Sequence, residues 1–262
     1  MYTDNSWTRA GATPASGVNT YTVTATDSQS HTNIATLTVN LPTSVTFTYD
    51  SQGNLISDGL RSFEYDFENQ LTNVYVAGAW RSEFAYDGLG RRRIRKEYGW
   101  SGSAWSLTNE VRYVYDGMLV LQERNGNNAA LVTYTRGLDL SSTFQGAGGI
   151  GGLLARQDSS GHYYFHSDAS GNVVGMLDAS GQVVARYSYD PFGNLLAMRG
   201  TMAAKNLYRF SSKEWHANSG LYYYGFRFYE PNLQRWLNRD PIGEAGGINL
   251  YAYCLNSPLY WI

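Results

Sequence analysis

One acidic residue near the C-terminus stands in a context that could support hydrolytic chemistry. Asp240 opens an Asp-Pro-Ile-Gly turn, follows Arg239 and lies in a run rich in aromatic residues. A carboxyl can act as a general acid or base, but an aspartyl mechanism needs two carboxyls that share one proton. A guanidinium would lower the pKa of a carboxyl that it meets, although neighbours on a strand point to opposite faces. The structural alternative is that the carboxylate of Asp240 accepts backbone N–H groups of its own turn.

Two other patterns suggest ligand sites, and a structural interpretation is favoured for both. His166 and Asp168 would share a face of a strand, with His162 nearby, yet two such residues are only half of a metal site. Residues 146–151 match G-x-G-x-x-G, but the sequence after them predicts a strand and a turn, whereas a dinucleotide site needs a helix there. The single cysteine, Cys254, cannot form an internal disulfide and lies among apolar neighbours. We therefore expect neither a metal nor a cofactor.

The composition argues against several functional classes. The 20 Lys+Arg residues nearly balance the 22 Asp+Glu residues, which argues against a nucleic-acid partner. The basic run 91–96 lies in an expected strand, and we interpret it as a solvent-facing surface. No stretch of the sequence is long and apolar enough to span a bilayer, and no serine- or zinc-hydrolase motif is present. The N-terminus lacks the profile of a signal peptide, so we expect a missing upstream segment that carries it.

The elements that must position Asp240 are strands. The chain has 22 Tyr, 10 Phe, 7 Trp and 28 Gly, and Tyr, Phe, Thr and Val suit a pleated, half-buried surface. Apolar and polar residues alternate with a period of two, and helical spacing is not sustained over any useful length. Gly beside Asn, Asp or Ser marks tight turns between these segments. The sequence therefore predicts an all-β protein.

Three regions differ in their pattern. Residues 1–42 hold one alternating hairpin, 20–27 with 33–40, which resembles the last two strands of an immunoglobulin-like domain. We interpret this region as the remnant of such a domain or as a linker, because an isolated hairpin is marginally stable in water. Residues 43–205 are repetitive, and residues 206–262 hold a dense series of aromatic motifs.

The middle region repeats a Tyr-Asp unit. Each unit is an alternating aromatic strand, then Tyr-Asp, then a turn that contains Gly or Asn. The pairs fall at 49–50, 65–66, 86–87, 115–116 and 189–190. We predict that each Asp accepts backbone N–H groups of its turn, and that each Tyr covers a neighbouring Tyr on the same sheet face. Because one unit buries too little surface to stand alone, the hairpins must stack side by side.

These repeats resemble the Rhs/YD-repeat family, and the last region resembles the Rhs-associated core of that family. Four motifs carry the resemblance of the core in the same order, at residues 208–214, 220–231, 235–243 and 246–253. Three upstream stretches support it, at 138–155, 162–173 and 189–193. The resemblance covers about residues 43–262. It implies β-hairpins that form part of a spiralling hollow shell capped by the core.

The resemblance also gives Asp240 a catalytic role. In this family the core seals the shell, and an aspartyl-protease-like pair cuts the chain just beyond it and frees a variable C-terminal segment. By resemblance Asp240 is the first acid of the pair, preceded by Arg239, and the second Asp is expected beyond Ile262. The sequence departs from the family pattern at Glu230, Gln234 and Ser257. We therefore expect a core truncated at its C-terminus, in a chain that is no enzyme by itself, whereas the longer parent could cleave itself.

The implied function is structural. We expect a shell fragment of a secreted or cell-surface bacterial protein, whose full-length parent encapsulates a variable, toxic C-terminal effector and delivers it in interbacterial competition. Its partners would be its own upstream repeats and the downstream effector. The alternative is a cell-surface adhesion or carbohydrate-binding module with glycans as partners, since Tyr and Trp rings stack well on sugars.

Overall fold

The computed structural model describes residues 14–260, which fall into two compact units divided between Thr46 and Phe47. Strands dominate the described residues, so the all-β prediction is confirmed. Three short 3-10 turns accompany them, η1 (Phe210–Ser212), η2 (Gly243–Gly246) and η3 (Cys254–Asn256). No helix within residues 14–260 has the length and apolar character needed to cross a membrane.

The first unit is the predicted hairpin. It consists of β1 (Gly17–Thr26) and β2 (Thr32–Leu41), paired antiparallel. Thr20 lies opposite Thr38 on one face, whereas Tyr21 lies opposite Leu37 on the other. None of the hairpin residues is buried. The alternation that predicts these strands therefore separates a threonine face from an apolar face, without a core of its own.

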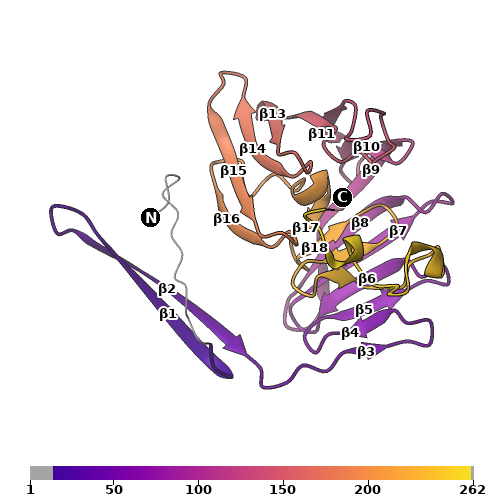
Figure 1. Ribbon diagram of the computed structural model, residues 1–262, viewed down its shortest axis with the longest axis horizontal. Coiled ribbons are helices and arrows are strands. Elements are labelled where there is room, and N and C mark those ends of the chain that lie inside the picture. The colour runs from indigo at the N-terminus through magenta and orange to yellow at the C-terminus, as the bar shows by residue number, and fades with distance from the viewer. Residues whose placement is uncertain (1–13, 261–262) are drawn as a thin grey trace. The chain divides into compact units, whose positions relative to one another are not determined.

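The second unit contains one large antiparallel sheet in which every strand pairs with its neighbours in the sequence. Its strands are β3 (Thr48–Tyr49), β4 (Leu55–Ser57), β5 (Ser62–Tyr65), β6 (Leu71–Val76), β7 (Trp80–Tyr86), β8 (Arg92–Trp100), β9 (Trp105–Asp116), β10 (Leu119–Arg124), β11 (Ala130–Arg136), β12 (Leu153–Asp158), β13 (Gly161–Ser167), β14 (Val173–Asp178), β15 (Val183–Tyr189) and β16 (Leu195–Arg199). The register shifts within most of these pairings, and such bulges bend and twist a sheet. The sheet accordingly curls around the C-terminal strands (Figure 1).

The turns between these strands are organised by aspartates. Asp87 Oδ1 accepts the N–H of Leu89 at 3.0 Å and that of Arg91 at 3.1 Å. The N–H four positions on is accepted in the same way by Asp50, Asp66, Asp168, Asp178 and Asp190. The predicted role of the repeat aspartates is confirmed at these turns. It is wrong at Asp116, because Asp116 pairs with Leu119 across a shorter turn that needs no side-chain cap.

The repeat tyrosines have a role that the sequence did not indicate. Tyr86 donates its hydroxyl to the carbonyl of Leu71 at 2.7 Å, and Leu71 begins the strand that follows the preceding aspartate turn. The same link joins Tyr65 to Leu55, Tyr115 to Arg92 and Tyr189 to Val173. Each repeat is thereby tied to an earlier one through a phenolic hydrogen bond.

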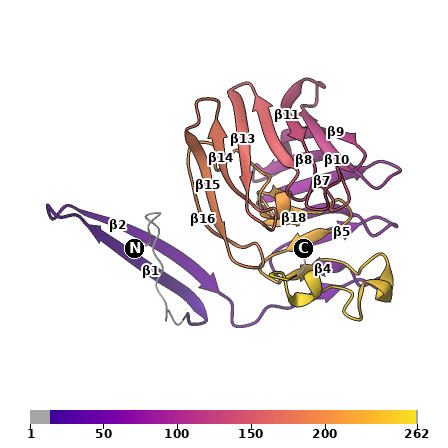
Figure 2. The same cartoon turned by 45° about the horizontal axis from the view of Figure 1, so that its top comes forward.

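The C-terminal residues form a second, smaller sheet inside the curve of the large one. Its strands are β17 (Glu214–His216), β18 (Leu221–Tyr223), β19 (Phe228–Glu230) and β20 (Arg235–Trp236). Leu221 and Phe228 of this core sheet pack with Phe63 and Phe84 of the large sheet. Strands β4–β8 and β13–β16 lie on different sides of these core strands (Figure 2).

The interpretation of the basic run 91–96 as a solvent-facing surface is wrong for two of its arginines. Arg92 and Arg95 are not solvent-facing, since their side chains are 0% and 7% exposed. Arg92 forms a buried ion pair with Glu214 of the core, and an Nη atom of Arg95 lies 3.7 Å from the same carboxylate. Strand β8 therefore turns part of its charged face inward, toward an acid that lies far along the sequence.

Candidate functional site

Asp240 lies just after β20, at the start of the predicted turn. Its carbonyl accepts the N–H of Gly243 at 2.9 Å, and its Oδ1 accepts the N–H of Ile242 at 3.1 Å. Its own N–H donates to the carbonyl of Leu250 at 2.8 Å. The turn role of the carboxylate is therefore confirmed, and the loop after the turn fixes its backbone.

The second carboxylate oxygen of Asp240 binds Arg227, a residue that the sequence analysis missed. Arg227 Nη2 lies 2.8 Å from Asp240 Oδ2, and the guanidinium stacks 4.2 Å from the centre of the Trp236 ring. Burial lowers the pKa of Arg227, while the carboxylate of Asp240 works in the opposite direction. Among residues 14–260 no group accepts a hydrogen bond from the buried Arg227 Nη1, so Asp240 is the partner that compensates this cation.

The register of the core hairpin could have identified Arg227. Tyr229 pairs with Trp236 across β19 and β20. Extended by two residues in each direction, this register sets Arg227 opposite Asn238 and diagonal to Asp240. Diagonal neighbours on a sheet are within reach of long side chains.

Arg239, which precedes Asp240 in the sequence, points away from the Asp240 carboxylate. Its guanidinium lies against Gly53, whose carbonyl accepts the hydroxyl of Tyr251 at 2.7 Å. Gly53 has a φ of +86°, and any Cβ there would collide with the Arg239 side chain. Arg239 therefore joins the core to the first Tyr-Asp turn, and within residues 14–260 the ion pair of Asp240 is formed by Arg227.

A cavity of about 580 Å³ opens beside Asp240. The core contributes Arg227, Asn238, Arg239 and Asp240 to its wall. The turns of the first repeats contribute the amide side chains of Gln52, Asn54, Asn69 and Gln70, together with Glu68 and residues 88–90. Amides offer donors and acceptors in equal measure, which suits an extended polypeptide.

The arrangement gives the carboxyl of Asp240 a cationic partner. A single aspartate cannot share a proton with itself, so an aspartyl mechanism still requires a second acid. The second Asp that the family resemblance implies falls beyond Ile262, outside the described residues, and stays a prediction.

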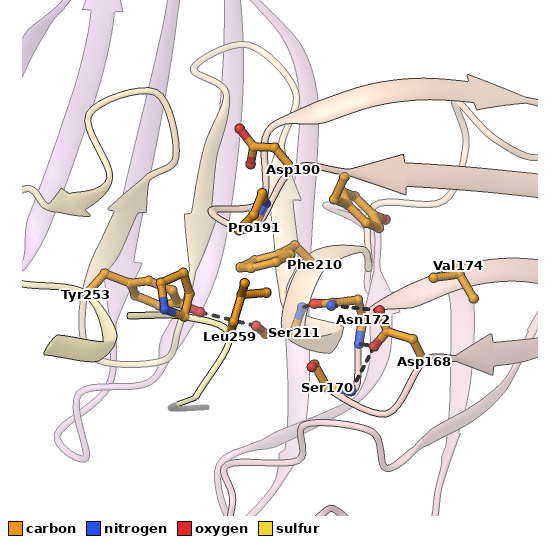
Figure 3. A pocket seen from close by; sticks show the side chains of 12 residues that line it. Asp168, Ser170, Asn172, Val174, Asp190, Pro191, Phe210, Ser211, Tyr253 and Leu259 are labelled. Atoms are coloured by element: carbon orange, nitrogen blue, oxygen red, sulfur yellow. Dashed lines mark hydrogen bonds between the residues drawn. The ribbon is translucent and has the colours of Figure 1, made fainter. Parts of the chain in front are cut away.

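The polar groups of the hairpin at residues 162–173, which carries His162 and His166, serve to hold its turn. Both carboxylate oxygens of Asp168 are used within its turn, by Ser170 and by the backbone and side chain of Asn172. Asn172 in turn accepts the N–H of Ser211, as Figure 3 shows at the wall of a cleft of about 270 Å³. Within residues 14–260 no group of three His, Cys, Asp or Glu residues is arranged to hold a metal ion.

The glycine-rich stretch 146–151 also follows the structural interpretation. It forms turns and leads into β12 (Leu153–Asp158), a strand, where a dinucleotide site needs a helix. The predicted strand after this stretch is confirmed.

Comparison with known proteins identifies the family. The teneurin YD-shell family model matches residues 38–258, which cover most of the chain. The chain belongs to this family. The resemblance to Rhs/YD-repeat proteins is thereby confirmed, and Asp240 lies inside the matched part of the YD shell.

Relatives of this YD-shell chain include several toxins. The double-stranded DNA deaminase toxin A of Burkholderia cenocepacia is 31% identical over 234 residues, which cover 82% of this chain and 16% of that protein. The tRNA3(Ser)-specific nuclease WapA of Bacillus spizizenii is 31% identical over 220 residues, with 80% and 9% covered. The toxin subunit YenC2 of Yersinia entomophaga is 41% identical over 79 residues, with 29% and 8% covered. The chain thus spans only a small part of each of these relatives.

Solved structures show the same fold. The TcdB2-TccC3-Cdc42 crystal structure superposes with a TM-score of 0.63 at 24% identity, covering 80% of this chain and 10% of that one. The Tc holotoxin pore of Photorhabdus luminescens gives a TM-score of 0.60 at 20% identity, covering 93% and 13%. The YD-shell fold is therefore shared with components of Tc toxins.

Proposed function

We propose that this chain is a wall-and-core segment of a toxin shell, whose longer parent encloses a variable C-terminal effector and delivers it in competition between bacteria. One observation carries the proposal. Relatives named for DNA deamination and for tRNA cleavage align with 82% and 80% of this chain, so the two alignments share most of it. A stretch shared by proteins with different named activities fits a common carrier better than it fits either activity.

The geometry supports a carrier. The large sheet curls around the strands of its own C-terminal core (Figure 2), so a segment that follows the core in the parent would start within the space that we propose the complete shell encloses. The parent would be secreted or displayed at the cell surface, and its partners would be its upstream repeats and its effector.

We also propose that Asp240 takes part in self-cleavage of the parent. The Asp240 carboxylate, whose Oδ2 lies 2.8 Å from Arg227 Nη2, would act as the general base that takes a proton from the water attacking the scissile carbonyl. A second carboxyl, supplied after Ile262, would donate its proton to the leaving amine as the C–N bond breaks. The chain described here lacks that partner, so it would be inactive alone. The amide-lined cavity beside Asp240 would hold the peptide to be cut.

The test is intact mass spectrometry of the parent, expressed with the residues that follow Ile262. The expected result is a break just beyond the core in the wild type and none in Asp240→Asn. Asp178→Asn is the matched control, because Asp178 accepts turn N–H groups in the same way without contacting the cavity. Equal cleavage in wild type and Asp240→Asn would refute the catalytic role and leave the shell role standing.

The carrier role has its own test. Limited proteolysis of the uncleaved parent should spare the effector segment, which should become sensitive once the shell is unfolded. An effector that is digested as fast as a free peptide would contradict enclosure.

We do not propose the glycan-binding alternative. Many of the aromatic rings that suggested it are stacked on one another in the core, around Phe210, Tyr222, Tyr229, Trp236 and Tyr253. Rings buried in this way have no free face for a sugar.

A further inference from the structure

A second cavity, of about 170 Å³, lies between the large sheet and the core and receives two cationic side chains. Arg136 comes from the end of β11, and Lys213 directly precedes β17. The rings of Tyr208, Tyr224 and Phe226 form part of the remaining wall. This volume exceeds by far the space that one water molecule needs.

The guanidinium of Arg136 is fixed in place, but some of its hydrogen-bond donors have no acceptor within the described part of the chain. Its Nε donates to the carbonyl of Val120 at 3.2 Å, and its plane lies over the rings of Tyr208 and Tyr134, 5.0 and 5.6 Å from their centres. Its two terminal nitrogens donate no hydrogen bond to any residue in the range 14–260. A planar donor edge is thus preorganised and vacant, in the geometry that binds two oxygens of one oxyanion.

The ammonium of Lys213 has spare donors as well. Its Nζ donates to the carbonyl of Gly148 at 2.5 Å and lies 5.4 Å from the centre of the Tyr224 ring. Gly148 has a φ of +63°, and a Cβ there would come within 3.2 Å of Nζ, so glycine allows this close approach. An ammonium has three donors, so two remain for a ligand.

The carboxylates nearest to these cations have other partners. Glu214 also lines the cavity, but its oxygens are bound by Arg92 and by the hydroxyl of Tyr113. Asp139, which attracts Lys213 from a distance, accepts N–H groups of its own loop. Burial and the nearby Arg136 lower the pKa of Lys213 to about 8. The two cations therefore repel each other in a site that is partly shielded from water. A bound anion would offset this repulsion.

We propose that this cavity is an oxyanion-binding site, in which Arg136 and Lys213 together hold one carboxylate or phosphate group. The Arg136 edge would bind two oxygens of the group, and Lys213 would bind one of these two or, in a phosphate, a third, with the aromatic walls covering the body of the ligand. The group could belong to a free small anion or to an acidic side chain of a polypeptide inside the shell.

The test follows the lysine amine directly. The chain has only Lys96 and Lys205 besides Lys213, so lysine-selective ¹³C labelling gives signals that mutation can assign. The full chain is titrated with pH in the presence of inorganic phosphate, of acetate, or of a blocked peptide with a single Glu. A bound anion raises the titration midpoint of Lys213 and leaves those of Lys96 and Lys205 in place.

The three probes separate the sources of the ligand. A shift with phosphate alone points to a free phosphate-type anion, whereas a larger shift with the peptide than with acetate points to an acidic side chain. No shift with any probe overturns the proposal.

A pair of variants checks that the two cations act together. Arg136→Gln should weaken binding of the effective probe roughly tenfold or more, because charge-assisted hydrogen bonds are lost. Arg112→Gln is the matched control, since the side chain of Arg112 is 43% exposed and does not line the cavity. Equal binding by wild type and Arg136→Gln would also overturn the proposal.

Discussion

The core sheet meets the large sheet in two chemically different ways. Toward β4–β7 it presents Leu221 and Phe228, which pack among buried apolar side chains such as Phe84. Toward β8 it presents Glu214 and His216, which meet buried charged groups. Both sets lie on one face of the small sheet, because Glu214 pairs with Tyr223, His216 with Leu221 and Tyr223 with Phe228. This face therefore has an apolar side and a charged side.

The charged side depends on its partners far more than the apolar side does. Arg92 is fully buried, and two of its three guanidinium nitrogens have no hydrogen-bond partner among the described residues. Its compensation comes from Glu214 and from the rings of Tyr113 and Tyr223, 4.7 and 4.3 Å away. Apolar packing tolerates small shifts, whereas a buried charge must find its partner. We therefore expect the apolar side to supply most of the stability and the charged side to set the position of β17.

The largest expected effect comes from breaking the ion pair. Glu214→Ala leaves Arg92 buried without its acid and should cost about 3–5 kcal/mol of unfolding free energy, measured by urea denaturation. Glu110→Ala is the control, because the side chain of its partner Arg112 is 43% exposed and the loss should stay below about 1 kcal/mol. The double variant Arg92→Met/Glu214→Met should recover most of the stability. Similar losses in the two alanine variants would remove the distinction between the buried pair and the surface pair.

A slightly smaller effect is expected on the apolar side. Leu221 is fully buried, and Leu221→Ala should cost about 3 kcal/mol through lost transfer energy and a residual cavity. Leu196→Ala, at a residue 67% exposed on β16, should change stability by less than about 0.5 kcal/mol. The loss from Leu221→Ala should be the same at pH 7.5 and pH 5.5, and a clear pH dependence would mean that the two sides of the core are coupled.

Acid should weaken only the charged side. Burial lowers the pKa of His216 below its ordinary value of 6.5, against the opposing effect of Glu97. The unfolded chain then binds a proton that the folded chain does not, so stability falls as the pH drops below 6.5. Glu97 and Glu214 also have lowered pKa values, despite burial, because His216 and Arg92 respectively favour their charged forms, so a further loss follows below 4.5.

Glu123 works in the opposite direction. Burial and the nearby Glu214 raise its pKa. Its contribution to stability is therefore fully present below pH 4.5 and is lost as the pH rises through the pKa of the folded state.

Urea unfolding of wild type and His216→Gln at pH 7.5 and 5.5 checks the contribution of His216. Lowering the pH from 7.5 to 5.5 should reduce the unfolding free energy of wild type more than that of His216→Gln. An equal reduction in the two proteins would exclude His216 as the titrating group.

The smallest effect sharpens the role of the repeats. Tyr86→Phe removes the hydroxyl that donates to Leu71 and should cost about 1 kcal/mol. Tyr164→Phe is the control, since the Tyr164 side chain is half exposed and its hydroxyl has no partner within residues 14–260. Thermal unfolding that does not separate the two variants would show that the phenolic links add nothing to stability.

The sequence predicts the parts of this structure that depend on neighbours in the chain. Alternation locates the strands, and Asp87 can cap its own turn because the N–H groups that it accepts lie two and four positions away. The charged interface could not be found in this way, because Arg92 and its acid are 122 positions apart and a basic strand face normally meets water. The sequence also did not reveal the partner of Asp240, for a related reason. Sequence adjacency offered only Arg239, whose side chain should point to the opposite face, whereas the hairpin register selects Arg227.

The strand order of the large sheet has a consequence for the making of the protein. Each strand from β3 to β16 needs only the strand synthesised just before it, so the wall can assemble during translation. A hairpin forms in about 1–10 μs, whereas a ribosome adds roughly 5–20 residues each second. Arg92 must nevertheless wait for Glu214, which emerges 122 residues later. The nascent wall therefore carries an unneutralised arginine on its inner side until Glu214 has been synthesised.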